Sequence, residues 1–434
     1  MKKPSPPPLN KPTSYRWTIC ALLFFATTIN YLDRQVIGLM KDTLALEFQW
    51  SEKDYSNIVM AFSTAYAIGL LGFGRLVDKI GTKLGYTVSV FIWSVFAMAH
   101  ALARNTFGFG FVRAGLGLGE AGNFPVAIKS VAEWFPKRER AFATGIFNSG
   151  TNSASIFGPL LIAWIYNAWG WRATFLWTGL LGFAWLIFWR VYYELPEKQK
   201  RANQAEVDLI HSDEAVTTSD EVDVPWNKLL ATRQTWAFIL GKFLTDPIWW
   251  FYLFWVPSYF NTTYALNLSK SAIHVSVVYM AAGLGSVLGG YLPGWLIKSK
   301  GWEVYKARKT AMLLYALLVI PVISIRFAEG IWTAVALISL ALAAHQAWSA
   351  NIFTTVSDMF PRRAVSSVVG IGGMAGSVGG ILFPLVIGIL LDHYKALGNI
   401  SPGYNIVFVV CGCGYLVAWL VMHLLAPKME RANV

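Results

Sequence analysis

The sequence predicts an all-α polytopic membrane protein with about twelve transmembrane helices in two parallel six-helix halves. Of its 434 residues, 55% are hydrophobic and 14% are charged, whereas a soluble domain carries roughly a quarter charged residues. The polar residues collect between apolar runs of about 20 residues, the length that crosses a hydrocarbon core about 30 Å thick. One sequence motif also recurs in the second half of the chain.

Each apolar run is interpreted as one membrane-spanning helix. The first run is long and interrupted by charge, so it does not have the pattern of a cleavable signal peptide. In chain order the runs cover residues 17–39, 55–77, 84–103, 106–131, 140–166, 171–193, 236–260, 271–297, 308–326, 331–357, 364–391 and 404–426.

The positive charges follow membrane topology. The net charge is +12, and most Lys and Arg residues fall on the side that holds the tails at 1–16 and 427–434 and the hydrophilic stretch at 194–235. Because positively charged loops stay inside the cell, we expect both termini in the cytoplasm and the protein in the inner (plasma) membrane. The excess of Lys and Arg is therefore explained by the orientation of the chain in a lipid bilayer, which is its expected partner. No nucleic-acid partner is expected.

The hydrophilic stretch at 194–235 is interpreted as a linker between two six-helix bundles, 17–193 and 236–426. The string EWFPKRERAFATGIF, which begins at Glu133, is echoed by DMFPRRAVSSVVGIG, which begins at Asp358. Parallel repeats of this kind occur in secondary transporters, whose substrate sites lie near the membrane midplane between the halves.

Two ionisable residues, Asp33 and Arg34, lie inside the first apolar run. A charge at this depth costs several kcal/mol and usually marks a functional site. Arg34 shares a helix face with Tyr31 and carries a permanent planar cation suited to a carboxylate, while Asp33 can gain or lose a proton. These residues predict a site for an anion and protons. A static ion pair that ties helices together is the alternative.

The fourth run carries Arg113 and Glu120, which are seven residues apart and face the same way. Asp33 and Arg113 lie at similar depth in antiparallel helices, so we expect them to pair. Glu120 would then be a second titratable carboxylate nearer the centre. The alternative is that Arg113 merely neutralises Glu120.

Other helices supply candidate substrate ligands. Tyr66 lies at mid-depth of the second run, where it suits either a hydrogen bond to substrate or ordinary packing. Thr151 is expected to face the cavity, and Trp249 offers a ring face. The string HQAWSAN on the tenth helix adds polar side chains suited to a hydroxyl-rich ligand, namely His345, Gln346, Ser349 and Asn351.

The loop GRLVDKIGTK at 74–83 has the features of a gate. Gly74 allows close helix approach, Asp78 can interact with the positive N-terminal end of a neighbouring helix, and Gly81 lies in the turn. An ordinary charged loop is the alternative. Lys129 and Lys242 are expected near the cytoplasmic ends of their helices, with their ammonium groups extended to the membrane surface.

Enzymatic chemistry has little support in the sequence. Cys20, Cys411 and Cys413 form no zinc pattern, and no nucleophile is accompanied by a base and an orienting group. We therefore expect no enzyme activity, no cofactor and no metal. The expected partners are a small organic anion and protons, and the expected state is a monomer.

The motifs resemble those of a known family. The 74–83 loop resembles the signature loop of the major facilitator superfamily, which implies the major facilitator fold. Within that superfamily, the anion:cation symporter family has strings similar to NYLDR (30–34), RAGLGLGEAGNFP (113–125), EWFPKRERAFATGIFNSG (133–150) and GWRATF (170–175). Its hexuronate transporters, which move glucuronate and galacturonate with protons, have strings similar to GTKLGY (81–86) and HQAWS (345–349).

The resemblance implies residue roles. Asp33 and Glu120 match the proton-coupling acids of that family, and Arg113 matches their partner. Thr151 stands where galactonate-type relatives carry a Gln, so hydroxyl contacts there do not transfer. The residues that match ligands of the sugar acid are Tyr31, Arg34 and Tyr66.

We therefore predict a proton-coupled symporter that imports a sugar acid, a hexuronate such as galacturonate or glucuronate, by alternating access. A transporter or exchanger of another organic anion, such as an aldonate, a dicarboxylate or a sugar phosphate, is the alternative. A transporter-like sensor is disfavoured because the 194–235 stretch is short for a signalling domain.

Overall fold

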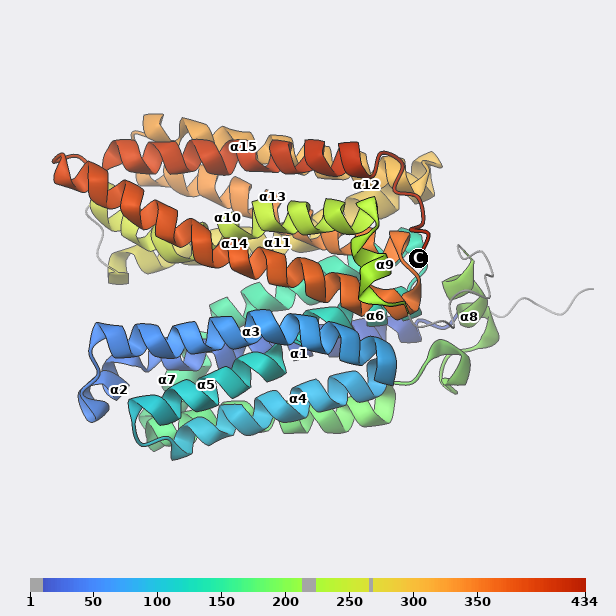
Figure 1. The fold of residues 1–434 in the computed structure, drawn as a ribbon, viewed down its shortest axis with the longest axis horizontal. Helices are drawn as coiled ribbons and strands as arrows, with labels where there is room; N and C mark the ends of the chain where they lie inside the picture. Colours follow the sequence, from blue (N-terminus) through green and yellow to red (C-terminus); the bar gives the residue numbers. More distant parts are fainter. Residues whose placement is uncertain (1–10, 213–223, 265–267) are drawn as a thin grey trace, which may run out of the picture.

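The computed structural model describes residues 11–212, 224–264 and 268–434, and these residues contain helices and no strand (Figure 1). The first half consists of α1 (Tyr15–Leu39), α2 (Lys41–Phe48), α3 (Glu52–Ile80), α4 (Thr82–Ala99), η1 (His100–Leu102), α5 (Thr106–Glu120), α6 (Asn123–Trp134) and α7 (Lys137–Tyr192). The second half consists of α10 (Arg233–Tyr264), α11 (Leu268–Lys300), α12 (Val304–Val319), η4 (Ile320–Phe327), α13 (Ile331–Met359), α14 (Arg362–Ala396) and α15 (Ser401–Leu425).

These elements form the twelve predicted spans, four of which do not correspond to one separate helix each. α7 contains the fifth and sixth spans, which meet at Gly170 with φ 79° and ψ 177°, a conformation that glycine adopts without steric cost. The fourth span is α5 followed by α6, and the ninth is α12 followed by η4. The predicted all-α fold is therefore confirmed.

Eight helices in the described part of the chain, α7 among them, are long and apolar enough to cross a membrane. The spans outside that set are α1, α5–α6 and α10. Each of these three carries buried ionisable side chains, among them Asp33, Glu120 and Lys242. Spans within that set also carry buried charges, among them Asp78 of α3 and Arg308 of α12.

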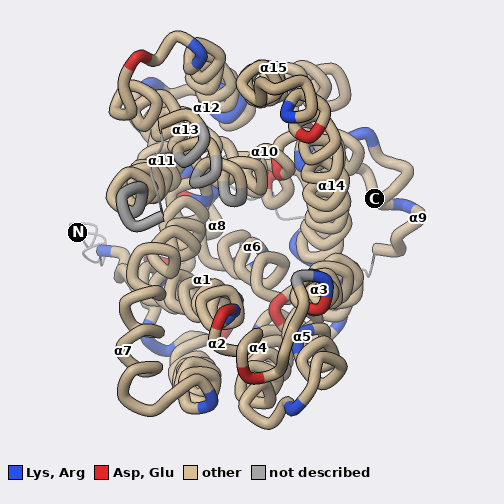
Figure 2. The backbone as a smooth tube through the Cα atoms, turned by 90° about the vertical axis from the view of Figure 1, so that its left-hand side faces the viewer, with Lys and Arg blue, Asp and Glu red and all other residues tan. Residues whose placement is uncertain are grey.

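The two halves form separate helix groups, as an end-on view shows (Figure 2). Between the groups, α7 packs against α11 and α3 packs against α14. A Cβ atom added at Gly74 of α3 would lie 2.6 Å from the carbonyl oxygen of Ser366 in α14. The glycine therefore lets these two helices approach each other closely, as predicted.

Further bonds between the halves lie at the end of the molecule where α8, α9 and the C-terminus are found, here called the linker end (Figure 1). Arg140 of α7 donates to the carbonyl oxygen of Ser357 at 2.6 Å. Arg308 of α12 donates to the carbonyl oxygen of Lys137 at 2.7 Å and to Asp358 at 3.0 Å. The halves are thus held together at the linker end.

The linker contains structure that the sequence did not predict: η2 (Pro196–Lys198), α8 (Gln204–His211) and α9 (Trp226–Leu230). α8 is amphipathic, with Val207 and Ile210 buried. The short helix α2, after α1, was also missed. The domain limits predicted from the sequence remain a proposal.

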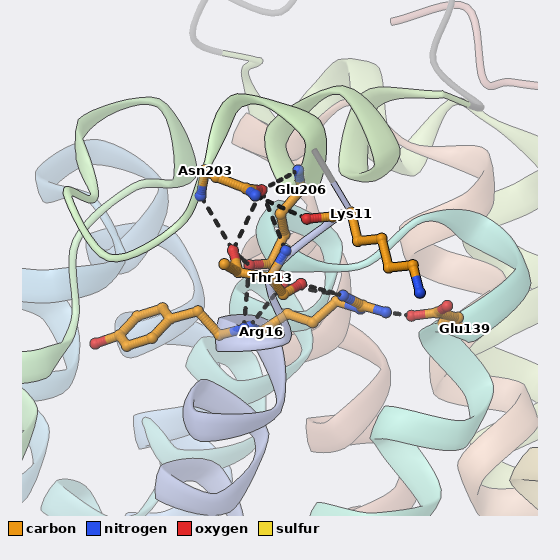
Figure 3. Close-up of polar contacts among 7 residues, drawn as sticks. Lys11, Thr13, Arg16, Glu139, Asn203 and Glu206 are labelled. Carbon is orange, nitrogen blue, oxygen red and sulfur yellow. Dashed lines mark hydrogen bonds and ion pairs between the residues drawn. The ribbon is translucent and has the colours of Figure 1, made fainter. Parts of the chain in front are cut away.

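α8 is fastened to the first half by a buried carboxylate (Figure 3). Glu206, which is fully buried, accepts hydrogen bonds from the Thr13 hydroxyl at 2.5 Å and from the backbone N–H groups of Tyr15 and Arg16 at 3.0 and 3.1 Å. The Arg16 guanidinium bonds Glu206 at 2.9 Å and Glu139 of α7 at 2.8 Å. Because Tyr15 and Arg16 begin α1, Glu206 satisfies backbone donors that the helix itself leaves free.

Candidate functional site

A central cavity lies between the halves, lined by residues of both. A second cavity shares Tyr31 and Arg34 with it and continues past Gly38 and Tyr55, which lie at the end opposite the linker end (Figure 1). The central cavity is thus approached from that opposite end. Its lining includes the predicted residues Tyr31, Arg34, Tyr66, Thr151, Trp249, His345, Gln346 and Ser349.

Arg34 is the cation that the first half presents to the cavity. Its Nε and Nη2 atoms bond Oε2 of Glu120 at 3.0 and 2.9 Å. The guanidinium carbon also lies 4.5 Å from the ring centre of Tyr31 and 4.7 Å from that of Tyr66. Aromatic faces attract a guanidinium, so the rings hold Arg34 in position while its side chain stays 14% exposed.

Among the described residues Arg113 forms no ion pair with Asp33 or Glu120, although both carboxylates lie within electrostatic range of it. Arg113 donates from Nη2 to the backbone carbonyl of Arg34 at 2.8 Å and lies over the Phe62 ring at 4.6 Å. Helix rotation explains the difference from the predicted pairing: Arg34 reaches Glu120 first, and Asp33 lies about 100° round the helix from Arg34. A static Asp33–Arg34 pair is not found either, because Arg34 pairs with Glu120.

Several buried polar atoms around Arg34 have no hydrogen-bond partner within the described residues. They are both carboxylate oxygens of Asp33, Nε and Nη1 of Arg113, and Oε1 of Glu120. Asp33 is 2% exposed and is absent from the cavity lining. Buried polar groups without partners are costly, so this cluster has spare capacity for protons, water or a ligand.

The predicted residues of helix α13 divide between two faces. His345 is hydrogen-bonded to the Tyr415 hydroxyl and stacks against Trp249 with ring centres 5.2 Å apart. Gln346 accepts a bond at 2.8 Å from Asn148 of α7, which joins the halves at the cavity. His345, Gln346 and Ser349 line the cavity.

Asn351 does not reach the cavity, and its prediction as a substrate ligand is not supported by its position. Its amide nitrogen donates to the carbonyl oxygens of Gly289 and Ala347 at 3.0 and 2.9 Å. Two residues past Ser349, a helical side chain points about 200° away from it, so Asn351 faces α11.

Thr151 lines the cavity, although its hydroxyl donates to the backbone carbonyl of Asn148 at 2.9 Å. Asn148, one turn before Thr151 in α7, also lines the cavity and donates from its amide nitrogen to Gln346 at 2.8 Å and to Ser286 at 3.2 Å. A short polar string, NSGTNS at 148–153, was the signal for both residues.

The sequence prediction placed two lysines wrongly. Lys242 of α10 is 4% exposed and lines the cavity, where its Nζ atom lies 2.7 Å from Asp246 and 4.1 Å from the Phe353 ring centre. Lys129 is 3% exposed and bonds Asp78 at 2.8 Å. Neither ammonium group reaches the membrane surface, because each has a carboxylate partner inside the protein.

Asp246 is the cavity residue that the sequence analysis missed. It lies four residues after Lys242 in an otherwise apolar run, a spacing that places the two side chains on one helix face. The four-residue spacing of these opposite charges could have predicted the Lys242–Asp246 ion pair from the sequence.

The loop residues lie where the halves meet at the linker end. Asp78 accepts hydrogen bonds from the backbone N–H groups of Ser366 and Ser367 at 3.3 and 2.7 Å, within the first turns of α14. Asp78 thus contacts the N-terminal part of α14, the second turn of that helix. Gly81 has φ 82° and connects α3 to α4. The gating role of these residues stays a prediction.

The sequence model described as Major Facilitator Superfamily matches residues 23–384. The chain belongs to the major facilitator superfamily. Its similarity to the hexuronate transporter of Escherichia coli K12 is 33% identity over 429 residues, which covers 98% of each chain. It is also 32% identical to the galacturonate transporter of Dickeya chrysanthemi over 70% of this chain and 89% of that protein. These similarities support the predicted resemblance to hexuronate transporters and a transporter rather than an enzyme.

Two further comparisons concern substrate range and fold. A protein of E. coli K12 named as a probable galactarate/D-glucarate transporter is 31% identical, with 96% of each chain covered. The structure of the proton:xylose symporter XylE bound to 6-bromo-6-deoxy-D-glucose aligns with a TM-score of 0.71 at 16% identity, covering 96% of this chain and 98% of that one. The membrane transporter fold of this multi-pass protein is therefore established.

Proposed function

We propose that the protein is a proton-coupled symporter that imports a sugar acid, a hexuronate such as galacturonate or glucuronate. The observation that carries the proposal is the Arg34–Glu120 pair at a cavity open from one end: a permanent cation, presented to a small-molecule site, whose partner is a carboxylate that a proton can neutralise. The hexuronate and galacturonate transporters among the relatives support the choice of substrate class.

Binding is competition between two carboxylates for Arg34. While Glu120 is ionised, its Oε2 atom accepts a hydrogen bond from Nε of Arg34 at 3.0 Å and forms an ion pair with Nη2 at 2.9 Å. When Glu120 takes a proton, its negative charge is lost and the substrate carboxylate replaces it as the partner of Arg34. Arg34 keeps its charge throughout, because a guanidinium does not deprotonate in a protein.

Asp33 serves as a second proton acceptor beside this pair. Its carboxylate is buried beside Glu120 and Arg113 and forms no ion pair within the described residues. The proton on Glu120 offsets the negative charge of the bound anion, because the substrate carboxylate takes the place of the Glu120 carboxylate beside Arg34. Arg113 supports the site by fixing the backbone of α1 through its bond to the Arg34 carbonyl.

Polar side chains of the second half bind the hydroxyl groups of the sugar acid. Gln346, Ser349 and His345 line the cavity opposite Arg34, and Trp249 offers a ring face beside His345. Alternating access then requires the contacts of Gly74 and Asp78 with α14 to open while the opposite end closes.

We further propose that the protein works as a monomer in the inner membrane with both termini cytoplasmic. The linker end would then be the cytoplasmic end, and the cavity would be open to the outside. A transporter of a dicarboxylate is the second candidate, and the galactarate/D-glucarate relative favours it.

The test is uptake of labelled galacturonate into proteoliposomes under an imposed pH gradient. We expect accumulation that depends on the gradient in the wild type, and downhill exchange without accumulation in Asp33→Asn and Glu120→Gln. Accumulation that ignores the gradient would exclude proton coupling, and absence of uptake would exclude the substrate class.

A further inference from the structure

We propose that Lys242 and Asp246 form a second position in the central cavity, which binds the hydroxyl end of the sugar acid, and that Asp246 excludes substrates with a carboxylate at that end. The inference rests on the proposed function and deepens it, because it separates hexuronates from six-carbon dicarboxylates. It assigns a specificity role to two residues of α10 that neither the sequence motifs nor the relatives indicate.

The pair lies across the cavity from Arg34. Lys242 and Asp246 belong to the second half and Arg34 to the first, yet all three line the same cavity. Asp246 is within electrostatic range of Tyr31 and Tyr66, the two rings that flank Arg34. A ligand held by Arg34 therefore extends toward Asp246.

The carboxylate, rather than the ammonium group, is the part of the pair that faces the ligand. The Lys242 side chain is 6% exposed and that of Asp246 is 22% exposed. Lys242 is also covered by the Phe353 ring, 4.1 Å from Nζ. Its charge is directed to Asp246 at 2.7 Å, so little of it is left for a ligand.

The position of the Asp246 carboxylate is fixed from two sides. Lys242 holds Oδ2 from the preceding helical turn, and Gly376 of α14 leaves the room for it, because a Cβ atom at Gly376 would collide with Oδ2. An ionised carboxylate has about four acceptor positions. With one taken by Lys242, the others are available for hydroxyl donors in the cavity.

The chemistry of the two ends separates the candidate substrates. In its ring form a hexuronate has one carboxylate, which Arg34 binds, and at the opposite end an anomeric hydroxyl beside further hydroxyls, which can donate to Asp246. A galactarate has the same number of carbons but a carboxylate at each end, so its second charge meets Asp246. Like charges brought together in a binding site oppose binding strongly.

The test compares binding of galacturonate and galactarate to the purified full-length protein by titration calorimetry. For the wild type we expect galacturonate to bind at least about tenfold more tightly. In Asp246→Asn the repulsion is removed and Lys242 is released for the second carboxylate, so the preference should fall at least about tenfold or reverse. Asp392→Asn, an exposed residue of α14 outside the cavity, is the matched control and should keep the wild-type preference.

A second measurement uses the wild type alone and does not depend on whether the variant folds. The monoamide of galactarate keeps the shape of the diacid but has one charge, and we expect it to bind at least about tenfold more tightly than galactarate. Equal affinity for galactarate and its monoamide, or an unchanged preference in a folded Asp246→Asn, would overturn the inference while leaving the proposed function intact. Binding of none of these acids would overturn both.

Discussion

Replacing Glu120 with Gln removes one charge from the Arg34 site and almost nothing else. The amide has the shape of the carboxylate, and its oxygen can still accept a hydrogen bond from Arg34. In the wild type both bonds, at 3.0 and 2.9 Å, end on the same charged oxygen of a fully buried side chain. The variant therefore reports on the charge of Glu120 as the competitor of the substrate carboxylate.

The size of the effect follows from the two bonds. A hydrogen bond to a charged group contributes about 1.5–3 kcal/mol, and charge-assisted bonds are about twice as strong as neutral ones. Neutralising Glu120 thus weakens its hold on Arg34 by about 2 kcal/mol in total. At alkaline pH, where the wild-type residue is ionised, the variant should bind galacturonate about 30-fold more tightly than the wild type.

The assay is the dissociation constant of galacturonate over a pH series, measured by titration calorimetry. Wild-type affinity should fall by about tenfold per pH unit on the alkaline side, since binding there requires the uptake of one proton. The Glu120→Gln affinity should lose that dependence. Glu303→Gln is the control, because Glu303 forms an exposed ion pair with Lys306 at 3.0 Å away from the cavity, and it should match the wild type.

Two results would refute the reasoning. A Glu120→Gln variant that binds more weakly than the wild type at alkaline pH would show that Glu120 assists the substrate rather than competing with it. A variant that keeps the wild-type pH dependence would assign the coupled proton to another group.

Two further predictions concern the anion ligand and the linker. Arg34→Lys should lose galacturonate binding by at least about tenfold although the charge is kept, because an ammonium group cannot form the two-pronged contact or stack as a guanidinium does; binding within twofold of the wild type, by the same calorimetry, would make Arg34 a structural residue. Glu206→Ala should destabilise the protein by about 1–3 kcal/mol, since it leaves the first N–H groups of α1 without their acceptor and leaves Arg16 with the partly exposed Glu139 as its partner. A thermal unfolding midpoint unchanged from the wild type, while Glu303→Gln also leaves it unchanged, would contradict the role of α8 as a fastening of the first half.

The fold was predictable because hydropathy and charge act locally. Runs such as 17–39 and 331–357 differ by only a few residues from α1 and α13, since the bilayer thickness sets their length. Arg34, Tyr66 and His345 were predictable for the same reason: polar side chains in apolar runs are expensive and tend to face a cavity. The linker helix α8 was missed although its sequence has a helix-capping Asn203 and buried Val207 and Ile210, because eight residues in a hydrophilic stretch are too short for a hydropathy pattern to show, and buried contacts with α1 complete its stability.

Partner choice within the site was not predictable, because it depends on how each helix is rotated about its axis. Glu120 pairs with Arg34, whereas the sequence analysis gave Arg113 as the partner of the two acids. A rotation of α5 by a fraction of a turn decides between these two arrangements. Lys242 was expected at the membrane surface because hydropathy ignores side chains that meet a carboxylate one turn away. Asn351 is the opposite case: it was predicted to bind substrate because it follows other polar residues of α13, but its side chain donates to the backbone of α11.

The most direct test of proton coupling is the movement of protons when galacturonate is the only driving force. Proteoliposomes with no initial pH gradient or membrane potential are given galacturonate outside, and the external pH is recorded. We predict that the medium becomes more alkaline as the sugar acid enters, and that Glu120→Gln, which lacks the proton carried by Glu120, gives a smaller pH change per galacturonate while still exchanging substrate. Galacturonate entry without any pH change in the wild type would contradict the account.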